Sequence, residues 1–238
     1  MKKKKIVVLT GAGVSAESGI KTFRDSNGLW ENYPVEDVAS IEGWYRDRAL
    51  VLAFYNARRR EVAATQPNAA HLAIASLEKE YDVTVITQNI DNLHERAGSS
   101  DIIHLHGEIT KVRPENCYNE RDGFSVKHVK DIGYRDINIG DLSDDGVQLR
   151  PHIVWFGEPV PNIEKAAEEV EKADCLLIVG TSMQVYPAAG LYLYAGSSTS
   201  IYIIDPKDVP LRDSRICHIK DVATHGMERF IEIIKKEF

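Results

Sequence analysis

The 238-residue chain carries 29 Lys and Arg against 36 Asp and Glu, a formal net charge of −7. A chain of this length can bury a substantial core, as one large domain or as a main domain with a smaller module. The acidic balance argues against a general nucleic-acid binder, and three well-separated cysteines give no disulfide framework. The only basic run near a terminus, residues 2–5, precedes a short apolar run. We therefore expect a cytoplasmic protein with neither a signal peptide nor a membrane span.

The first predicted element is a strand over residues 6–10, which leads directly into a glycine-rich turn. Gly11, Gly13 and Ala16 fit the dinucleotide fingerprint G-x-G-x-x-G/A. A helix is expected to start near Val14 and to turn its positive end toward a ligand, with backbone N–H groups facing a phosphate. We interpret the two glycines as removing side chains that would keep a pyrophosphate away.

Residues 19–36 are rich in turn formers and contain no run of β-branched residues. A hydride-transferring dehydrogenase would place a second strand here, ending in an acidic residue that holds the ribose. The segment predicts a long functional loop instead. We expect the loop to fold over a cofactor, with Arg24 facing phosphate charge and Phe23 supplying an apolar wall.

Further strands and helices alternate along the chain, which favours a parallel sheet covered on both faces. The predicted strands are residues 82–87, 102–106, 152–156, 175–180 and 200–205, and the predicted helices are residues 48–64, 68–81, 162–173 and 224–236. Residues 36–81 and 108–151 do not fit the alternation, and we assign both to a smaller module. Within it, Asp144-Asp145-Gly146 is a predicted hairpin turn.

Four motifs in a fixed order resemble the sirtuin family of NAD-dependent protein lysine deacylases. They are Gly-Ala-Gly-Val-Ser at 11–15, Thr-Gln-Asn-Ile-Asp-Asn-Leu-His at 87–94, Leu-His-Gly-Glu at 105–108 and Gly-Thr-Ser at 180–182. The resemblance covers nearly the whole chain and implies one catalytic domain over residues 1–238. Its doubly wound, Rossmann-like parallel sheet would comprise residues 1–35, 82–107 and 152–238, with the smaller module inserted.

His106 lies where an apolar strand meets Gly107, and the near-neutral pKa of histidine suits proton transfer. The resemblance implies that the acyl-lysine oxygen attacks C1′ of the nicotinamide ribose of NAD, with His106 as general base on a ribose hydroxyl. Asn89 would order the ribose and the reacting water, and Asp91 would bind the nicotinamide carboxamide. The products would be free lysine, nicotinamide and O-acyl-ADP-ribose. We interpret His71, His94 and His104 as structural.

The resemblance also implies a set of residues that bind NAD. They are Gly11, Ala12, Gly13, Ser15, Ile20, Phe23, Arg24, Trp30, Gln88, Asn89, Ile90, Asp91, Gly180, Thr181, Ser182, Asp205 and Ala223. At Asp205 the family commonly has an asparagine near the adenosine ribose. A carboxylate can still accept hydrogen bonds from ribose hydroxyls.

Two segments are predicted to bind the acylated protein. Val154, Phe156 and Gly157 resemble the family segment that pairs with the acyl-lysine peptide as an added strand. Trp155 and Phe156 face opposite ways on a strand, so one of them is expected in the core. Tyr55 and Arg58 share one face of a helix and resemble the bacterial and mitochondrial class that accepts acidic acyl groups. We therefore expect removal of succinyl and malonyl groups as well as acetyl groups.

The chain departs from the family pattern at the structural zinc site. Pro114 stands where the first zinc cysteine would follow residues 111–113, and Cys117 is the only cysteine between Gly107 and Pro151. Cys117 and His128 supply at most two of four ligands. We therefore predict no zinc and no other metal site. The module would be held by apolar residues, namely Phe124, Val126, Ile132, Tyr134, Ile137, Ile139 and Leu142.

Three other functions stay open at this point: a hydride-transferring oxidoreductase, a protein mono-ADP-ribosyltransferase using the same NAD site, and a non-catalytic NAD-sensing module. The missing second strand disfavours the first. The combination of His106, Asn89 and Asp91 counts against the last. The expected partners are acylated-lysine proteins, with no specific nucleic acid and no membrane, and the protein is expected to be a monomer.

Overall fold

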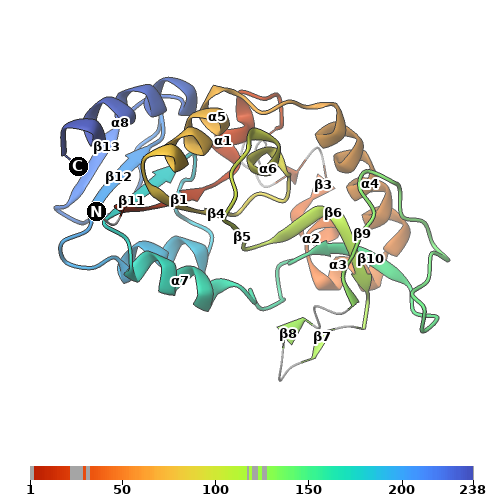
Figure 1. Cartoon of the computed structure of the whole chain (residues 1–238). Helices are drawn as coiled ribbons and strands as arrows, with labels where there is room; N and C mark the ends of the chain where they lie inside the picture. Colours follow the sequence, from red (N-terminus) through yellow and green to blue (C-terminus); the bar gives the residue numbers. More distant parts are fainter. Residues whose placement is uncertain are drawn as a thin grey trace.

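The computed structural model describes residues 3–21, 29–30, 33–116, 118–119, 123–124 and 128–237, with only the backbone described at 29–30, 118–119 and 123–124. The main feature is a six-stranded parallel sheet in the order β13-β12-β11-β1-β4-β5 (Figure 1). Its strands are β1 (Lys5–Thr10), β4 (Asp82–Thr87), β5 (Ile102–His104), β11 (Cys175–Val179), β12 (Ser200–Ile204) and β13 (Ile216–Ile219). Counted along the sheet from β5, this is the 3-2-1-4-5-6 order of a doubly wound dinucleotide-binding fold.

Both faces of this sheet are apolar because alternate residues of each buried strand point to opposite sides. Ile6 and Val8 of β1 pack beneath α1 (Ala12–Ala16), α5 (Ala69–Ser76) and α8 (Ala223–Glu237). Val7 and Leu9 pack against α7 (Ile163–Glu171) and the 3-10 helix η3 (Ala188–Tyr194) on the other face. Figure 1 shows α5 and α8 above the sheet and α7 below it. The predicted doubly wound α/β architecture is confirmed.

A second, antiparallel sheet has the order β10-β6-β9, with β6 (Gly107–Pro114) between β10 (Leu149–Ile153) and β9 (Lys130–Asp131). It packs against α2 (Val35–Val38), α3 (Ile41–Arg46) and α4 (Arg48–Ala64) around a separate apolar cluster that includes Trp44, Val112 and Trp155. Two-residue strand pairs flank it: β2 (Leu29–Trp30) with β3 (Tyr33–Pro34), and β7 (Tyr118–Asn119) with β8 (Gly123–Phe124).

The prediction that residues 152–156 form a strand of the parallel sheet is wrong. The strand covers Leu149–Ile153 and pairs antiparallel with β6, with His152 opposite Glu108. The physical reason is that β6 starts directly after His106 and lies beside residues 149–153, whose backbone therefore bonds to β6 and not to the parallel sheet. Three other expectations need refinement: β5 ends at His104, α5 ends at Ser76 before the short 3-10 helix η1 (Leu77–Lys79), and α5 packs on the main sheet.

Within the module, Ile137 is buried, and Ile132 and Tyr134 pack against the cluster as predicted. The prediction is wrong for Ile139 and Leu142, which are 59% and 52% exposed. They lie in a surface hairpin that is held by hydrogen bonds of the backbone and of polar side chains. In one of these, Nε2 of Gln148 donates to the carbonyl oxygen of Asn138 at 3.0 Å. The predicted turn at residues 144–146 is present, with Gly146 at φ +76° and Leu142 bridged to Gln148. Cys117, Val126 and the side chain of Phe124 lie outside the described residues.

The predicted helix over residues 48–64 is observed with the same bounds as α4. Asp47 caps it by accepting a hydrogen bond from the backbone N of Leu50 at 2.9 Å. A short helix, α6 (Leu93–Ala97), follows β4 and ends at Gly98, whose φ of +103° stops it. None of the helices in the described ranges has the length and apolar character needed to cross a bilayer.

Candidate active site

The candidate site lies at the carboxyl ends of β1, β4 and β11, where the direction of strand succession reverses. In open α/β sheets this switch point is where ligands bind. From β1 the chain continues to β4 on one side, and β11 lies on the other. The turns after β1 and β11 therefore meet, and they are the segments that carry the first and last of the four sequence motifs.

The glycines of the turns after β1 and β11 allow the backbones of these two turns to come into close contact. A Cβ on Gly13 would lie 2.7 Å from Cα of Gly180, and a Cβ on Gly11 would lie 2.7 Å from Cβ of Thr181. The N–H groups of Gly11 and Gly13 donate to the carbonyl oxygens of Val179 and Gly180 at 3.1 and 2.8 Å. This corrects our interpretation that these glycine N–H groups face a phosphate: they join the two turns.

Ser15, which is 1% exposed, connects three parts of the site. Its hydroxyl donates to Oδ2 of Asp91 at 3.1 Å and accepts from Nδ2 of Asn89 at 3.1 Å. Asn68, the N-cap of α5, donates from Nδ2 to the carbonyl oxygen of Val14 at 2.8 Å. Helix α1 is therefore held between the loop after β4 and the start of α5.

Asn89 and Asp91 follow β4 and are nearly buried, at 9% and 6% exposure. Asn89 also donates from Nδ2 to the carbonyl oxygen of Gly11 at 3.1 Å. Asp91 Oδ1 accepts from the backbone N of Leu93 at 3.0 Å, so it stabilises the start of α6. Burial raises the pKa of Asp91, although the bonds from Leu93 and Ser15 oppose that change. The structure thus brings the predicted catalytic Asn89 next to two predicted cofactor-binding residues.

His106 lies between β5 and β6 and is half-buried. Its Nδ1 lies 2.9 Å from the carbonyl oxygen of Gln88, so Nδ1 carries the proton and Nε2 is the basic nitrogen. Burial lowers the pKa of His106, while the bond to Gln88 raises it by a smaller amount. The imidazole is therefore neutral at physiological pH and able to accept a proton at Nε2.

Threonines at the ends of two neighbouring strands support this arrangement, and sequence reasoning missed them. Thr10 and Thr87 are both fully buried, and their hydroxyls lie 2.9 Å apart. Thr87 Oγ1 accepts from the backbone N of Asn89 at 3.1 Å, which fixes the turn that leads into the motif. Their place in the sequence could have identified them, because each threonine is the last residue of its strand and the two strands are neighbours in the parallel sheet.

Gln88 and Thr181 join the loop after β4 to the turn after β11. Gln88 Nε2 donates to Oγ1 of Thr181 at 3.2 Å, and Thr181 Oγ1 also accepts from the backbone N of Met183. Ser182 is half-buried beside them. Met183 has a φ of 51°, a left-handed conformation that is uncommon for a residue with a side chain. Such strain is often found at ligand-binding turns.

The remaining predicted cofactor contacts are more scattered. Ile20 and Ile90 pack against the apolar cluster of the smaller sheet, and Ala223 is buried at the start of α8. Asp205 follows β12, and its Oδ1 accepts from the backbone N of Lys207 at 2.9 Å. Phe23, Arg24 and the side chain of Trp30 lie outside the described residues. Among the described residues, the structure therefore groups the predicted contacts around the ends of β1, β4 and β11.

The segment after β10 contains the predicted peptide-binding residues. Trp155 is 3% exposed and Phe156 is 49% exposed, which confirms that only one of the two belongs to the core. The N–H of Val154 donates to the carbonyl oxygen of His106 at 2.9 Å, so this segment is tied to the catalytic candidate. Phe156 exchanges backbone bonds with residues 39 and 41, and Gly157 is exposed with a φ of +88°.

Tyr55 is fully buried on α4, and its hydroxyl accepts from Nε1 of Trp155 at 2.8 Å. Burial raises the pKa of Tyr55, so the phenol stays neutral and is a hydrogen-bond donor. The Arg58 side chain is 17% exposed and pairs with Glu61 at 3.1 Å. Arg59 is fully buried, and burial lowers its pKa to about 10. Of three consecutive arginines, only Arg60 lies on a solvated face, with a 58% exposed side chain.

The chemical groups at this edge of the sheet are of the types that bind a dinucleotide. The ends of β1, β4 and β11 present amide, hydroxyl and carboxylate groups from Ser15, Asn89, Asp91 and Thr181, which can pair with ribose hydroxyls and a carboxamide. The neutral imidazole of His106 lies one hydrogen bond away from the same loop, through Gln88. A base, a set of orienting amides and a buried carboxylate therefore converge at one sheet edge.

Comparison with known proteins agrees with this geometry. Residues 11–187 match the family model described as the Sir2 family. A protein of Bacteroides thetaiotaomicron named NAD-dependent protein deacylase is 53% identical over 234 residues, which is 97% of this chain and 98% of that protein. A solved Sir2 homologue in complex with NAD superposes with a TM-score of 0.84 at 38% identity, covering 99% of this chain and 91% of the other. A Sir2 variant solved with a deacetylated peptide and 3′-O-acetyl ADP-ribose gives a TM-score of 0.78 at 29% identity, covering 97% and 94%. The chain belongs to the Sir2 family.

Proposed function

We propose that this protein is an NAD-dependent protein lysine deacylase that removes acetyl, succinyl and malonyl groups from lysine side chains. The observation that carries the proposal is the tautomer of His106: its Nδ1 proton is held by the carbonyl oxygen of Gln88 at 2.9 Å, which leaves Nε2 as a base. The relatives at about half identity named NAD-dependent protein deacylase support the reaction class.

NAD, when bound, supplies a ribose whose bond to nicotinamide is broken and whose hydroxyl captures the acyl group. His106 accepts the proton of that hydroxyl at Nε2, and the bond from Nδ1 to Gln88 stabilises the charged ring that forms. Asn89, held by Ser15 and Gly11, orients the ribose through its side-chain amide. Asp91, buried and fixed by Leu93 and Ser15, presents a carboxylate to the nicotinamide amide.

The acyl-lysine segment is proposed to lie along Val154, Phe156 and Gly157. The N–H and C=O of Phe156 already bond to residues 39 and 41, so peptide pairing relies on other backbone groups of the segment. Gly157 is suited to this role, because it is exposed and hydrogen-bonds to no other residue of the described part of the chain. Recognition through the backbone implies weak sequence preference.

The acidic acyl preference is proposed to depend on Tyr55 and Arg58. Tyr55 contacts Trp155 of the peptide-binding segment, with ring centroids 5.9 Å apart. A neutral phenol and a guanidinium can hold a carboxylate together, with the guanidinium supplying charge and the phenol a directed hydrogen bond. The partly buried setting of Arg58, whose side chain is 17% exposed, strengthens such a pairing relative to a fully solvated arginine.

We also propose that the smaller module folds without zinc. Pro114 occupies the position of the first expected cysteine, and a structural site built from cysteine and histidine needs four such ligands, of which Cys117 and His128 supply at most two. The apolar cluster around Ile109, Val112 and Ile153 supports the module, and the buried pairs of Arg113 and Arg150 with Glu158 add to it.

The function is tested by mass spectrometry of acetyl-, succinyl- and malonyl-lysine peptides incubated with and without NAD. Free lysine peptide, nicotinamide and O-acyl-ADP-ribose are expected only with NAD. His106→Ala should lower the rate by about 10²- to 10⁴-fold, the usual contribution of a general base. ADP-ribose attached to protein, or NAD binding without nicotinamide release, would instead identify a transferase or a sensing module.

Replacing Arg58 with Met separates the acyl preference from the core reaction. The loss of the guanidinium removes a charge-assisted bond to succinyl and malonyl carboxylates, which acetyl lacks. We expect desuccinylation, measured as kcat/KM, to fall by at least tenfold more than deacetylation. Arg60→Met, on the solvated side of the same helix, is the matched control and should change neither. Equal losses in both activities for Arg58→Met would contradict the assignment.

A further inference from the structure

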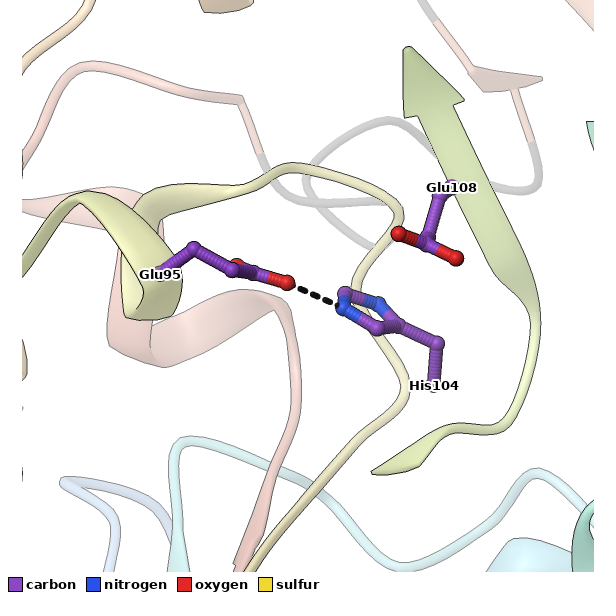
Figure 2. Close-up of side chains that lie close together, drawn as sticks. All are labelled: Glu95, His104 and Glu108. Atoms are coloured by element: carbon purple, nitrogen blue, oxygen red, sulfur yellow. Dashed lines mark hydrogen bonds and ion pairs between the residues drawn. The ribbon is translucent and has the colours of Figure 1, made fainter. Parts of the chain in front are cut away.

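A second cluster of ionisable side chains lies behind the catalytic loop and has no part in the proposed reaction. Glu95 of α6, His104 at the end of β5 and Glu108 of β6 place one ligand atom each within 4.8 Å of one another. Figure 2 shows the imidazole of His104 between the two carboxylates, with its edge toward Glu95. Nε2 of His104 lies 2.6 Å from Oε1 of Glu95. The three residues come from three different elements, which is why their sequence spacing gave no metal motif.

The other ring nitrogen of His104 is also oriented. Nδ1 lies 3.4 Å from the carbonyl oxygen of Asn89, at the long end of a hydrogen bond. Histidines that bind metals usually donate their second ring N–H to a carbonyl or carboxylate, which fixes the tautomer and aims the free nitrogen at the ion. His104 has this arrangement, with Nε2 facing Oε1 of Glu95. Its side chain is 8% exposed, whereas that of Glu95 is 38% exposed and leaves a path from solvent.

The charges of the cluster favour a cation. The carboxylates of Glu95 and Glu108 both lie beside the imidazole of His104, with one ligand atom of each residue within 4.8 Å of the others. The two carboxylates therefore create a negative potential at Nε2. One cation is already near: Nζ of Lys111 lies 2.7 Å from Oε2 of Glu108. A divalent ion that replaces the imidazole proton and displaces Lys111 from Glu108 balances both carboxylates.

We propose that Glu95, His104 and Glu108 form a binding site for a divalent transition-metal ion of the Zn²⁺ or Mn²⁺ type. One imidazole and two carboxylates suit these ions, whereas Mg²⁺ prefers oxygen ligands alone. Ligand atoms on one tetrahedral ion lie roughly 3.3 Å apart, so the 2.6 Å contact between Glu95 and His104 has to open slightly. The exposed Glu95 side chain can make that movement.

An ion at this position ties together α6, β5 and β6 around the catalytic residues without touching them. His104 and Glu108 flank Leu105, His106 and Gly107 in sequence, and His104 contacts the backbone of Asn89. The ion is therefore expected to stabilise the folded loop and to raise the melting temperature. It takes no part in proton transfer, because Nε2 of His106 belongs to a separate ring.

The test measures metal binding without NAD or peptide, so its result is independent of the proposed deacylase activity. The chelator-treated protein is titrated with Zn²⁺, Mn²⁺ and Mg²⁺ by calorimetry, with the melting temperature followed in parallel. We expect one Zn²⁺ or Mn²⁺ per chain and an upward shift of the melting temperature, with Mg²⁺ giving much weaker binding.

Glu95→Gln and Glu108→Gln, which keep the shape of each side chain, should each weaken binding by at least tenfold. Circular dichroism verifies that both variants fold. His225→Gln is the matched control, because His225 faces a single carboxylate, Asp221, at 3.7 Å. Cys217→Ser, at an exposed thiol, controls for adventitious zinc. Equal affinity in the wild type and both glutamine variants, or no binding up to about 1 mM metal, would overturn the proposal and leave a proton-linked ion pair at this place.

Discussion

The tautomer of His106 is set by one backbone contact. Its Nδ1 proton is directed to the carbonyl oxygen of Gln88, the residue just before Asn89. The same loop therefore orients both the base and the amide that are proposed to act on the ribose. A histidine at the end of a strand is common in proteins, and the bond to Gln88 is the feature of this one that supports the proposed role as a base.

The pH profile of the reaction tests this assignment. Burial lowers the pKa of His106 below the ordinary value of 6.5. The neutral ring is the active form, so kcat/KM should be constant above pH 6.5 and should decline only as the pH falls through the lowered pKa. The profile is measured with an acetyl-lysine peptide at saturating NAD. An acidic limb centred above pH 6.5 would show that a different group limits the rate.

At the scale of elements, the contact between the turns after β1 and β11 decides the shape of the site. The approach is closer than a side chain permits: a Cβ on Gly180 would lie 2.4 Å from the backbone N of Val14. Gly180 also has a φ of +60°, which disfavours other residues. Backbone atoms cannot move aside as a flexible side chain can, so both turns depend on glycine.

Gly13→Ala should therefore destabilise the protein. Within a helix, alanine is normally better than glycine by about 1 kcal/mol, so helix propensity alone predicts the opposite sign. The methyl group would lie 2.7 Å from Cα of Gly180, and we expect a net loss of roughly 1–3 kcal/mol, typical of overpacking. Urea unfolding measures it. Gly190→Ala, where the nearest atom is 3.8 Å away, is the control and should be close to neutral.

The smaller sheet is joined to the segment that is proposed to bind the peptide by a buried ionic cluster. The Glu158 side chain is 5% exposed and accepts from Arg113 at 3.2 Å and from Arg150 at 2.7 Å. Glu158 also accepts from the backbone N of Trp155 at 2.9 Å, and Arg150 stacks on the Trp155 ring at 3.5 Å. Strands β6 and β10 thus fix the segment that follows them.

Glu158→Gln should be strongly destabilising, because it removes the buried negative charge that the guanidinium groups of Arg113 and Arg150 share. Removal of one partner from a buried ion pair typically costs about 3–5 kcal/mol. The free energy of unfolding in urea is the readout. Asp144→Asn breaks the exposed pair with Lys130 and should leave the free energy of unfolding nearly unchanged. A loss from Glu158→Gln no larger than that of this control would show that the cluster adds little.

At the scale of the whole molecule, buried neutral histidines couple folding to pH. His71 and His94 lie with ring centroids 4.9 Å apart beneath the site and are 0% and 1% exposed. Burial lowers the pKa of His71 to about 4 and that of His94 to about 3. In the unfolded chain both groups titrate near 6.5.

Between these values the unfolded chain binds more protons than the folded protein, so stability rises with pH. The contribution is complete above pH 6.5 and is lost as the pH falls toward 4 for His71 and toward 3 for His94, on the order of 3 and 5 kcal/mol respectively. The raised pKa of His104 has the opposite effect on the pH dependence of stability, but it concerns one group only. Urea unfolding at pH 7.5 and pH 5 should show a marked loss at pH 5. His94→Gln should reduce the loss, and exposed His225→Gln should not. A pH-independent stability for the wild type would contradict the coupling.

The sequence by itself determined five of the six strands of the main sheet and the grouping of most candidate site residues at one edge of it. Runs of β-branched residues predict strands regardless of which strands they pair with. The motifs at 11–15, 87–94, 105–108 and 180–182 follow such strands directly. Because the carboxyl ends of parallel strands lie at one edge of the sheet, the sequence predicts that Asn89, His106 and Thr181 lie close together. The strand β13 was missed because its four residues include an exposed cysteine and a histidine among only two isoleucines.

Tertiary structure alone decided which partner each group meets. The strand at Leu149–Ile153 left the parallel sheet because β6 offered it an antiparallel edge. The paired threonines, the contact of Gly13 with Gly180, and the cluster of Glu95, His104 and Glu108 join residues far apart in the chain or on different elements. Local sequence sets the conformation of each segment, but the distance between two side chains depends on how whole elements pack, and no local pattern contains that information.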